Sequence, residues 1–182
     1  ISFSKSNCEK IYQLINKPIV SIDAYGELDA GQENHVLNIG LDDESGGYLM
    51  TKYLLECGYE HIQVCAGRDN GVDHFRYMGA QRAAKEFAGK KQKVQFTALG
   101  MNYAKRKESY AWLIQRKKPK TALFFLSDLY ALEAISFFSI RGVKIPEEIG
   151  IAGYDNISYA EFSVPRLTTI SQNVEQKASL AV

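Results

Sequence analysis

The sequence is poor in the features that mark several protein classes, and each shortage narrows the choice. Only 4 of its 182 residues are Pro and 14 are Gly, which excludes a collagen-like or low-complexity chain. No apolar run reaches the ~18 residues that a membrane-spanning helix needs, so no membrane partner is expected. The formal net charge of +1 excludes an overall basic surface for nucleic acid but leaves a local basic patch open.

Cysteine and histidine are scarce too, with three residues of each. Cys8, Cys57 and Cys65 follow no metal-ligand spacing, and we interpret them as buried or half-buried thiols of a protein in the reducing cytosol. The His residues form no H-x-x-x-H pair. The sequence therefore predicts no metal site.

Motifs for bound cofactors and for catalysis are missing as well. No G-x-G-x-x-G follows a strand and there is no G-x-x-x-x-G-K-[ST], so the sequence offers no phosphate cradle for a nucleotide. It contains neither a G-x-S-x-G elbow nor a Cys–His spacing typical of a nucleophile. We expect no cofactor and no enzymatic activity.

The sequence does contain a regular alternation of short apolar runs with helical segments. Hydrophobic residues make up 46% and charged residues 24%, which is typical of a folded chain of one large domain or two small lobes. Strands are predicted at 18–22, 62–66, 94–98, 122–126 and 149–152, with a weaker candidate at 36–39. Helices are predicted at 8–16, 44–57, 76–88, 104–117 and 129–141, and a last one begins near 174–178. This order predicts an α/β fold with parallel sheets and helices on both faces.

Polar residues collect where the predicted strands end. Asp23, Ser127-Asp128 and Asp155 each follow a strand, and Arg76 begins the helix after another. Ligands of open parallel sheets bind outside the carboxyl ends of the strands. Carboxylates accept hydrogen bonds from vicinal hydroxyls and a guanidinium donates to two oxygens, so the set suits a neutral polyol. An aromatic ring such as that of Tyr103 could cover the apolar face of a sugar.

Each of these residues also has a plainer interpretation. An Asp at a strand end can cap the next helix or close a turn, and this is the favoured interpretation for Asp128, which directly precedes the helix 129–141. Tyr103 could simply be exposed or packed. The basic runs 90–93 and 116–118 each follow a helix and are interpreted as solvated helix ends.

Two segments near the end of the chain resemble one protein family closely. Residues 143–156 (VKIPEEIGIAGYDN) resemble the segment G-x-x-I-P-E-D-I-S-V-x-G-F/Y-D-D/N of LacI/GalR-type bacterial transcription regulators. Residues 165–170 (PRLTTI) resemble their P-x-L-T-T-I/V segment. Weaker matches lie upstream in the correct order, at 42–62, 76–79 and 127–131. The resemblance covers essentially the whole chain.

The resemblance implies a periplasmic-binding-protein-like effector domain with two α/β lobes and a ligand cleft between them. Residues 1–41 would be part of an incomplete N-terminal lobe, 42–168 the C-terminal lobe, and 169–182 the crossover back to the N-terminal lobe. The first strand and helix of the N-terminal lobe would precede Ile1. We expect the helix-turn-helix headpiece of the family to lie outside this fragment, so that contact with operator DNA would be made only by that headpiece.

The resemblance also implies effector contacts. Arg76 and Asp155 match the most regular ligand contacts of the family, and Asp23 matches a position that commonly contacts sugar hydroxyls. Ser127 stands where many members have Asn, and Asp128 beside it completes the main predicted set together with Tyr103 at the aromatic position. Four further residues lie near contact positions: Phe3, Ser4, Asn70 and His74.

The implied function is the effector-binding and dimerisation core of a cytoplasmic, homodimeric regulator that senses a small sugar or related polyol. The apolar residues of helices 44–57 and 76–88 could serve either the core or a partner subunit. A secreted sugar-binding receptor of a transporter shares the fold and is the main alternative, and a phosphoprotein corepressor could replace a small effector.

Overall fold

The computed structural model describes residues 5–24, 36–69, 71–87 and 92–181. The chain divides into two compact units, Ile1–Asp42 with Gln172–Val182 and Asp43–Ser171. The smaller unit contains α1 (Lys5–Ile15), β1 (Ile19–Ile22), β2 (Val36–Ile39) and α7 (Val174–Leu180). Its two strands are parallel and in register from Ile19 opposite Val36. The weak candidate strand at 36–39 is thus confirmed.

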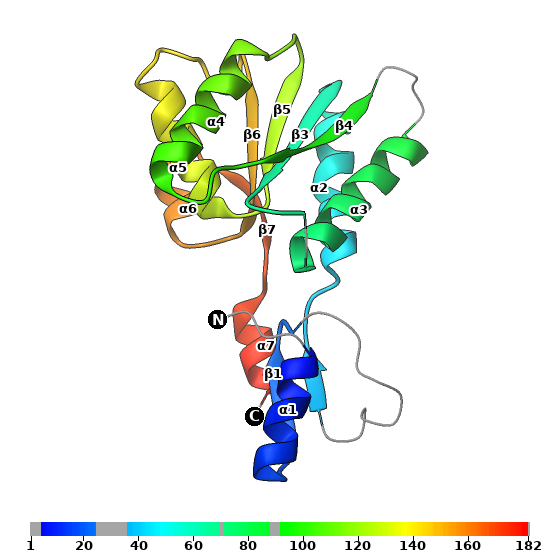
Figure 1. Cartoon of the computed structure of the whole chain (residues 1–182). Coiled ribbons are helices and arrows are strands. Elements are labelled where there is room, and N and C mark those ends of the chain that lie inside the picture. The colour runs from blue at the N-terminus through cyan, green and yellow to red at the C-terminus, as the bar shows by residue number, and fades with distance from the viewer. Residues whose placement is uncertain (1–4, 25–35, 70, 88–91, 182) are drawn as a thin grey trace. The chain divides into compact units, whose positions relative to one another are not determined.

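The larger unit is built on one five-stranded sheet (Figure 1). The strands are β3 (His61–Ala66), β4 (Lys93–Ala98), β5 (Thr121–Phe125), β6 (Gly150–Asp155) and β7 (Thr168–Ser171), in the order β4-β3-β5-β6-β7. All neighbouring pairs are parallel, so the strands end at one common edge. The helices are α2 (Asp43–Glu56), α3 (Gly71–Glu86), α4 (Tyr103–Gln115), α5 (Asp128–Ser139) and the short α6 (Tyr159–Phe162).

Two layers of helices cover the sheet, and alternate strand residues divide between them. In β5, Ala122 and Phe124 belong to the hydrophobic cluster that includes side chains of α2 and α3. Leu123 and Phe125 belong to the other cluster, with side chains of α4 and α5. Figure 1 shows these helix pairs on opposite sides of the sheet. The predicted fold class is therefore confirmed.

Two glycines allow α2 and α3 to touch through their backbones. A Cβ on Gly47 would lie 1.9 Å from the carbonyl oxygen of Arg76, and one on Gly79 would lie 1.8 Å from that of Glu44. Neither contact leaves room for a side chain. This close approach fixes α3 against the start of α2 and so sets the position of Arg76.

The structure differs from the prediction in two places that concern the site. The helix expected to begin at Arg76 begins at Gly71. Arg76 therefore lies in the second turn of the helix, where its side chain is buried. Thr168–Ser171 form the strand β7, which pairs with β6 and places Thr169, Ile170 and Ser171 in the larger unit. No strand was expected there, because TTIS is short and half polar.

Candidate functional site

The common edge where the strands of the larger unit end is also where helices begin. Asp43, Asp73 and Asp128 lie in the first turns of α2, α3 and α5. Unpaired N–H groups and the helix dipole make the start of a helix electropositive, which favours carboxylates there. Acidic side chains from three separate elements therefore gather at this edge.

Arg76 is the one buried arginine among these carboxylates, with 6% of its surface exposed. Its Nε donates to Asp43 Oδ1 at 2.7 Å and its Nη1 donates to the carbonyl oxygen of Leu126 at 2.9 Å. Its guanidinium carbon lies 3.8 Å from the centre of the Tyr154 ring. Burial acts to lower the pKa of Arg76. The negative charge of Asp43 and the hydrogen bond to it act in the opposite direction, and the pKa is raised overall. Among the described residues, Nη2 has no hydrogen-bond partner.

Asp73 lies one helical turn before Arg76, with its Oδ1 3.7 Å from Arg76 Nη1. Only 28% of its side chain is exposed. Burial raises the pKa of Asp73 to about 6; Arg76 acts in the opposite direction, and the charges of Asp155, Asp43 and Asp69 add to the rise. Sequence reasoning missed this residue, although its spacing of three from Arg76 on one helix would have placed it on the same face.

Asp155 is presented by an unusual turn at the end of β6. Asp155 has a φ of 121° and Asn156 a φ of 55°, backbone conformations that residues other than glycine rarely adopt. Ser127 Oγ donates to Asp155 Oδ2 at 3.0 Å, which joins the ends of β5 and β6. Strained backbone of this kind persists only where surrounding contacts hold it, and it is common at ligand sites.

Asp128 supplies those surrounding contacts. It is fully buried, and its carboxylate accepts hydrogen bonds from Thr169 Oγ1 at 2.6 Å and from the N–H of Ile157 at 2.9 Å. A Cβ on Gly153 would lie 2.1 Å from Asp128 Oδ1, so that position requires glycine. Burial raises the pKa of Asp128, while both hydrogen bonds oppose the rise. Asp128 therefore holds the turn that follows Asp155, and its carboxylate is buried inside the larger unit.

Two predicted contacts of the larger unit lie on its surface. Tyr103 is the first residue of α4 and is half exposed, with Lys107 Nζ 5.1 Å from the centre of its ring. His74 is half exposed on α3, and its Nδ1 lies 2.8 Å from Asp69 Oδ1. Over the described part of the chain, neither residue has a hydrogen bond or ion pair with Arg76. Arg76 instead donates to the carbonyl oxygen of Leu126, the residue before Ser127, and Ser127 donates to Asp155.

Asp23 belongs to the smaller unit and is described there alone. It follows β1 with a φ of 55°. Lys177 Nζ on α7 donates to Asp23 Oδ2 at 2.7 Å and to Gln172 Oε1 at 2.8 Å. Three predicted contacts lie outside the described residues: Phe3, Ser4 and Asn70.

A separate cavity lies at the opposite edge of the same sheet, where the strands begin. Its volume is about 210 Å³. It is lined mainly by polar and basic side chains of β3, β4, β5, α4 and the segment that follows α4: His61, Gln63, Lys93, Gln95, Trp112, Leu113, Arg116, Lys117, Lys118, Thr121 and Leu123. Its lining contains no carboxylate.

Over the described residues, no group of three or more His, Cys, Asp or Glu side chains is arranged to hold a metal ion. In the same part of the chain no helix is both long and apolar enough to span a membrane. Cys8, Cys57 and Cys65 are free thiols, and Cys57 is exposed.

A parallel sheet with helices on both faces, and a buried arginine among carboxylates at its carboxyl edge, define an α/β ligand-binding domain. The chain belongs to the family described as "Periplasmic binding protein-like domain", whose model matches residues 51–182. This confirms the predicted resemblance to the effector domains of LacI/GalR-type regulators.

Relatives agree with that assignment. The repressor PurR of Haemophilus influenzae is 36% identical over 139 residues, which is 73% of this chain and 40% of the repressor. The regulator DegA of Bacillus subtilis is 31% identical over 137 residues, 75% of this chain and 40% of the regulator. The chain thus spans well under half the length of either relative.

Solved structures share the fold. A LacI-family regulator from Enterococcus faecium with bound ribose has a TM-score of 0.78 at 23% identity, over 98% of this chain and 64% of that one. The Escherichia coli repressor ascG has a TM-score of 0.76 at 21% identity, over 98% and 64%.

Proposed function

We propose that the chain is the effector-binding core of a ligand-responsive transcription regulator, and that it binds a small sugar or related polyol at the carboxyl edge of the larger unit. Buried Arg76 carries the proposal. Asp43, Leu126 and Tyr154 hold its guanidinium in place, and its Nη2 has no partner among the described residues. A pre-positioned donor at the same sheet edge as the strained Asp155 suits a ligand rich in hydroxyl groups.

The proposed effector contacts are Arg76, Asp155 and Ser127, with Tyr103 and Asp23 as further candidates. Asp128 acts behind them by fixing the turn. Ligand binding would change operator affinity only if the ligand contacts two states of the protein differently. The DNA contact itself would be made by a headpiece outside this chain. The regulator would act in the cytoplasm and without catalysis.

A secreted sugar receptor remains the rival proposal, because it would use the same fold. Two observations favour the regulator. The relatives named above are repressors or regulators, and the free, exposed Cys57 suits a reducing compartment. The gene sequence upstream of Ile1 decides between the two: a helix-turn-helix supports the regulator, and a signal peptide would support the receptor.

The effector proposal is tested by calorimetry on the full-length protein with a panel of pentoses, hexoses, disaccharides and nucleosides. At least one of these should bind. Arg76→Lys and Asp155→Ala should each lower the affinity for that ligand by tenfold or more, which corresponds to about 1.4 kcal/mol. Arg116→Ala, which changes an arginine at the opposite edge of the sheet, is the control and should leave the affinity unchanged. Equal affinities for all variants would reject the site.

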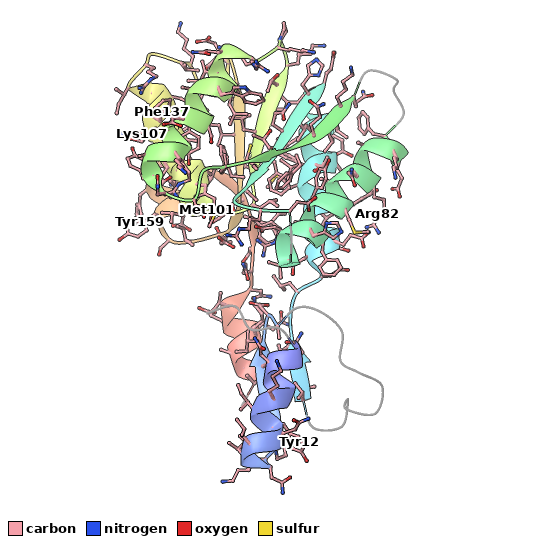
Figure 2. All side chains as sticks on the ribbon, in the orientation of Figure 1. Tyr12, Arg82, Met101, Lys107, Phe137 and Tyr159 are labelled. Atoms are coloured by element: carbon pink, nitrogen blue, oxygen red, sulfur yellow. The ribbon has the colours of Figure 1, made fainter. Side chains whose placement is uncertain are left out.

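We further propose that the protein is a homodimer and that α6 contributes to its contact surface. Tyr159, Phe162 and Val164 are large apolar residues of α6 and the segment after it, and all three are strongly exposed. Figure 2 shows Tyr159 at the outer margin of the larger unit. The apolar residues of α2 and α3 are divided: Met50, Leu54 and Ala80 are buried in the core. Leu49, Tyr53, Phe75 and Met78 are exposed, so these two helices stay a second candidate surface. Several large apolar side chains exposed close together in the sequence suit an interface between copies.

Sedimentation of the Phe162→Glu variant tests the dimer surface. Phe162 is 76% exposed, and Ile140 on the same unit is 80% exposed, so Ile140→Glu is a matched control. The first variant should sediment as a monomer at concentrations where the control and the unchanged protein are dimers. If both variants stay dimeric, the contact surface lies elsewhere.

A further inference from the structure

Among the described residues of the candidate effector site, carboxylates outnumber cations. Arg76 is paired with Asp43 at 2.7 Å, and that pair is nearly neutral as a unit. Asp73 lies 3.7 Å from the same guanidinium, and Asp155 is close enough that its charge acts on Asp73. Among the described residues that these contacts join, Asp73 thus adds a negative charge beyond the nearly neutral Arg76–Asp43 pair.

Asp73 is ionised at neutral pH, although its surroundings disfavour the charged form. Its pKa is raised to about 6 by burial, and the nearby charges of Asp155, Asp43 and Asp69 add to this effect. The side chain is nevertheless mostly ionised at pH 7, because that pH lies above its pKa. Asn or Ser at this position would avoid the cost of desolvating the charge. A residue that is unfavourable for folding and lies beside a ligand donor is a candidate for a role in recognition.

The charge has different consequences for different ligands. Hydroxyl and ammonium groups donate hydrogen bonds to carboxylates, so a sugar or an amino sugar gains contacts from Asp73 and Asp155. A phosphate group is repelled by the same carboxylates at separations where the Coulomb interaction in a partly buried site is substantial. Arg76 cannot compensate fully, because two of its nitrogens are already committed to Asp43 and Leu126.

We propose, on the basis of the effector function above, that Asp73 is a specificity-determining residue of this site. It selects uncharged or cationic ligands that bring hydroxyl or amino donors, and it excludes their phosphorylated forms. Specificity is the difference between the affinities for two ligands. A group that repels the unwanted ligand therefore contributes to specificity as much as one that attracts the wanted ligand.

Calorimetry on the full-length protein with matched probes tests the proposal. The probes are ribose with ribose 5-phosphate, and glucose with glucosamine and glucose 6-phosphate. In the unchanged protein each phosphorylated member should bind at least ~tenfold more weakly than its unphosphorylated partner. Asp73→Asn should reduce this ratio by ~tenfold, and Asp73→Glu should keep it. Asp69→Asn removes the same charge from the exposed residue that contacts His74, and should change the ratio less than twofold.

The outcomes separate the two proposals. If sugars bind and Asp73→Asn leaves the ratio unchanged, or if the phosphorylated member binds more tightly to the unchanged protein, the selectivity proposal is wrong while the effector site stands. If no probe binds and Arg76→Lys changes nothing, the site itself is wrong and the selectivity proposal fails with it. A thermal melt of each variant confirms that it is folded, and Asp73→Asn is expected to be at least as stable as the unchanged protein.

Discussion

The two edges of the five-stranded sheet hold their charges in different ways. At the carboxyl edge, the shortest contacts of the buried Arg76 and Asp128 join separate elements. Arg76 of α3 reaches Asp43 of α2 and the end of β5, and Asp128 of α5 reaches Thr169 of β7. At the amino edge the cavity is lined by exposed Lys93, Arg116 and Lys118.

This difference indicates that the charged groups at the carboxyl edge contribute to the stability of the fold, whereas those at the amino edge are solvated and contribute little. A buried ion that loses its partner pays its full desolvation cost, whereas exposed pairs contribute little because water and salt screen them. Substitutions should therefore be costly at the carboxyl edge and nearly neutral at the amino edge. The predictions below follow that order, from the largest expected effect to the smallest.

The largest effect is expected for Arg76→Met. The substitution leaves Asp43 half-buried without its cation and removes the donor to Leu126. We expect the free energy of unfolding to fall by about 3–5 kcal/mol, the range typical of a broken buried ion pair. Urea denaturation of the variant measures it. The double substitution Arg76→Met with Asp43→Leu should recover part of the loss, because no unpaired charge remains; no recovery would mean that the pair is not the cause.

Asp128→Ala should have the next largest effect. It leaves the hydroxyl of Thr169 and the N–H of Ile157 without their acceptor, and each unsatisfied buried group costs about 1–3 kcal/mol. We expect a loss of roughly 2–4 kcal/mol by urea denaturation. Asp128→Asn keeps one acceptor oxygen and should lose less. Equal losses for the two variants would show that volume, and not hydrogen bonding, determines the effect.

Much of the larger unit could be predicted from local pattern. β3 and β5 read as apolar runs because parallel strands covered on both faces bury both sets of side chains. β7 escapes prediction because the sequence TTIS becomes a strand only through its pairing with β6. The first turn of α3 escapes prediction because Gly71 and Asp73 are residue types typical of loops.

The site could be predicted only in part for a related reason. Asp155 stands out at the end of a strand and Arg76 in the helix that follows another. The structure places Ser127 beside Asp155, as expected for neighbouring strands. The pairing of Arg76 with Asp43 joins residues far apart in the sequence, so no spacing rule reveals it. Asp128 follows β5 as predicted, but the sequence does not reveal that its buried carboxylate binds Thr169 and Ile157.

Asp73→Asn should change stability in the opposite direction, and only above acidic pH. The pKa of Asp73 is raised from 3.8 to about 6, so the native state is favoured by protonation. That contribution to the free energy of unfolding is complete below pH 3.8 and is lost as pH rises through about 6.

The free energy of unfolding of Asp73→Asn should therefore equal that of the unchanged protein near pH 3.5 and exceed it by ~1–3 kcal/mol at pH 8, since each pKa unit is about 1.4 kcal/mol. Urea denaturation at both pH values measures the difference, and Asp69→Asn serves as the exposed control. A difference that does not vary with pH would argue against the buried charge as its cause.

The smallest effects are expected at the amino edge, where Trp112, the single tryptophan of the sequence, reports directly on the cavity. Arg116 lies with its guanidinium 4.9 Å from the Trp112 ring, and both side chains are exposed. Arg116→Ala should change the free energy of unfolding by no more than ~0.5–1 kcal/mol, the usual worth of an exposed cation–aromatic contact. It should leave effector affinity within twofold, and it should reduce the quenching of Trp112 fluorescence by iodide, because an attracting cation is lost. If Arg116→Ala instead weakened the effector tenfold while Asp155→Ala did not, the two edges would have to exchange roles.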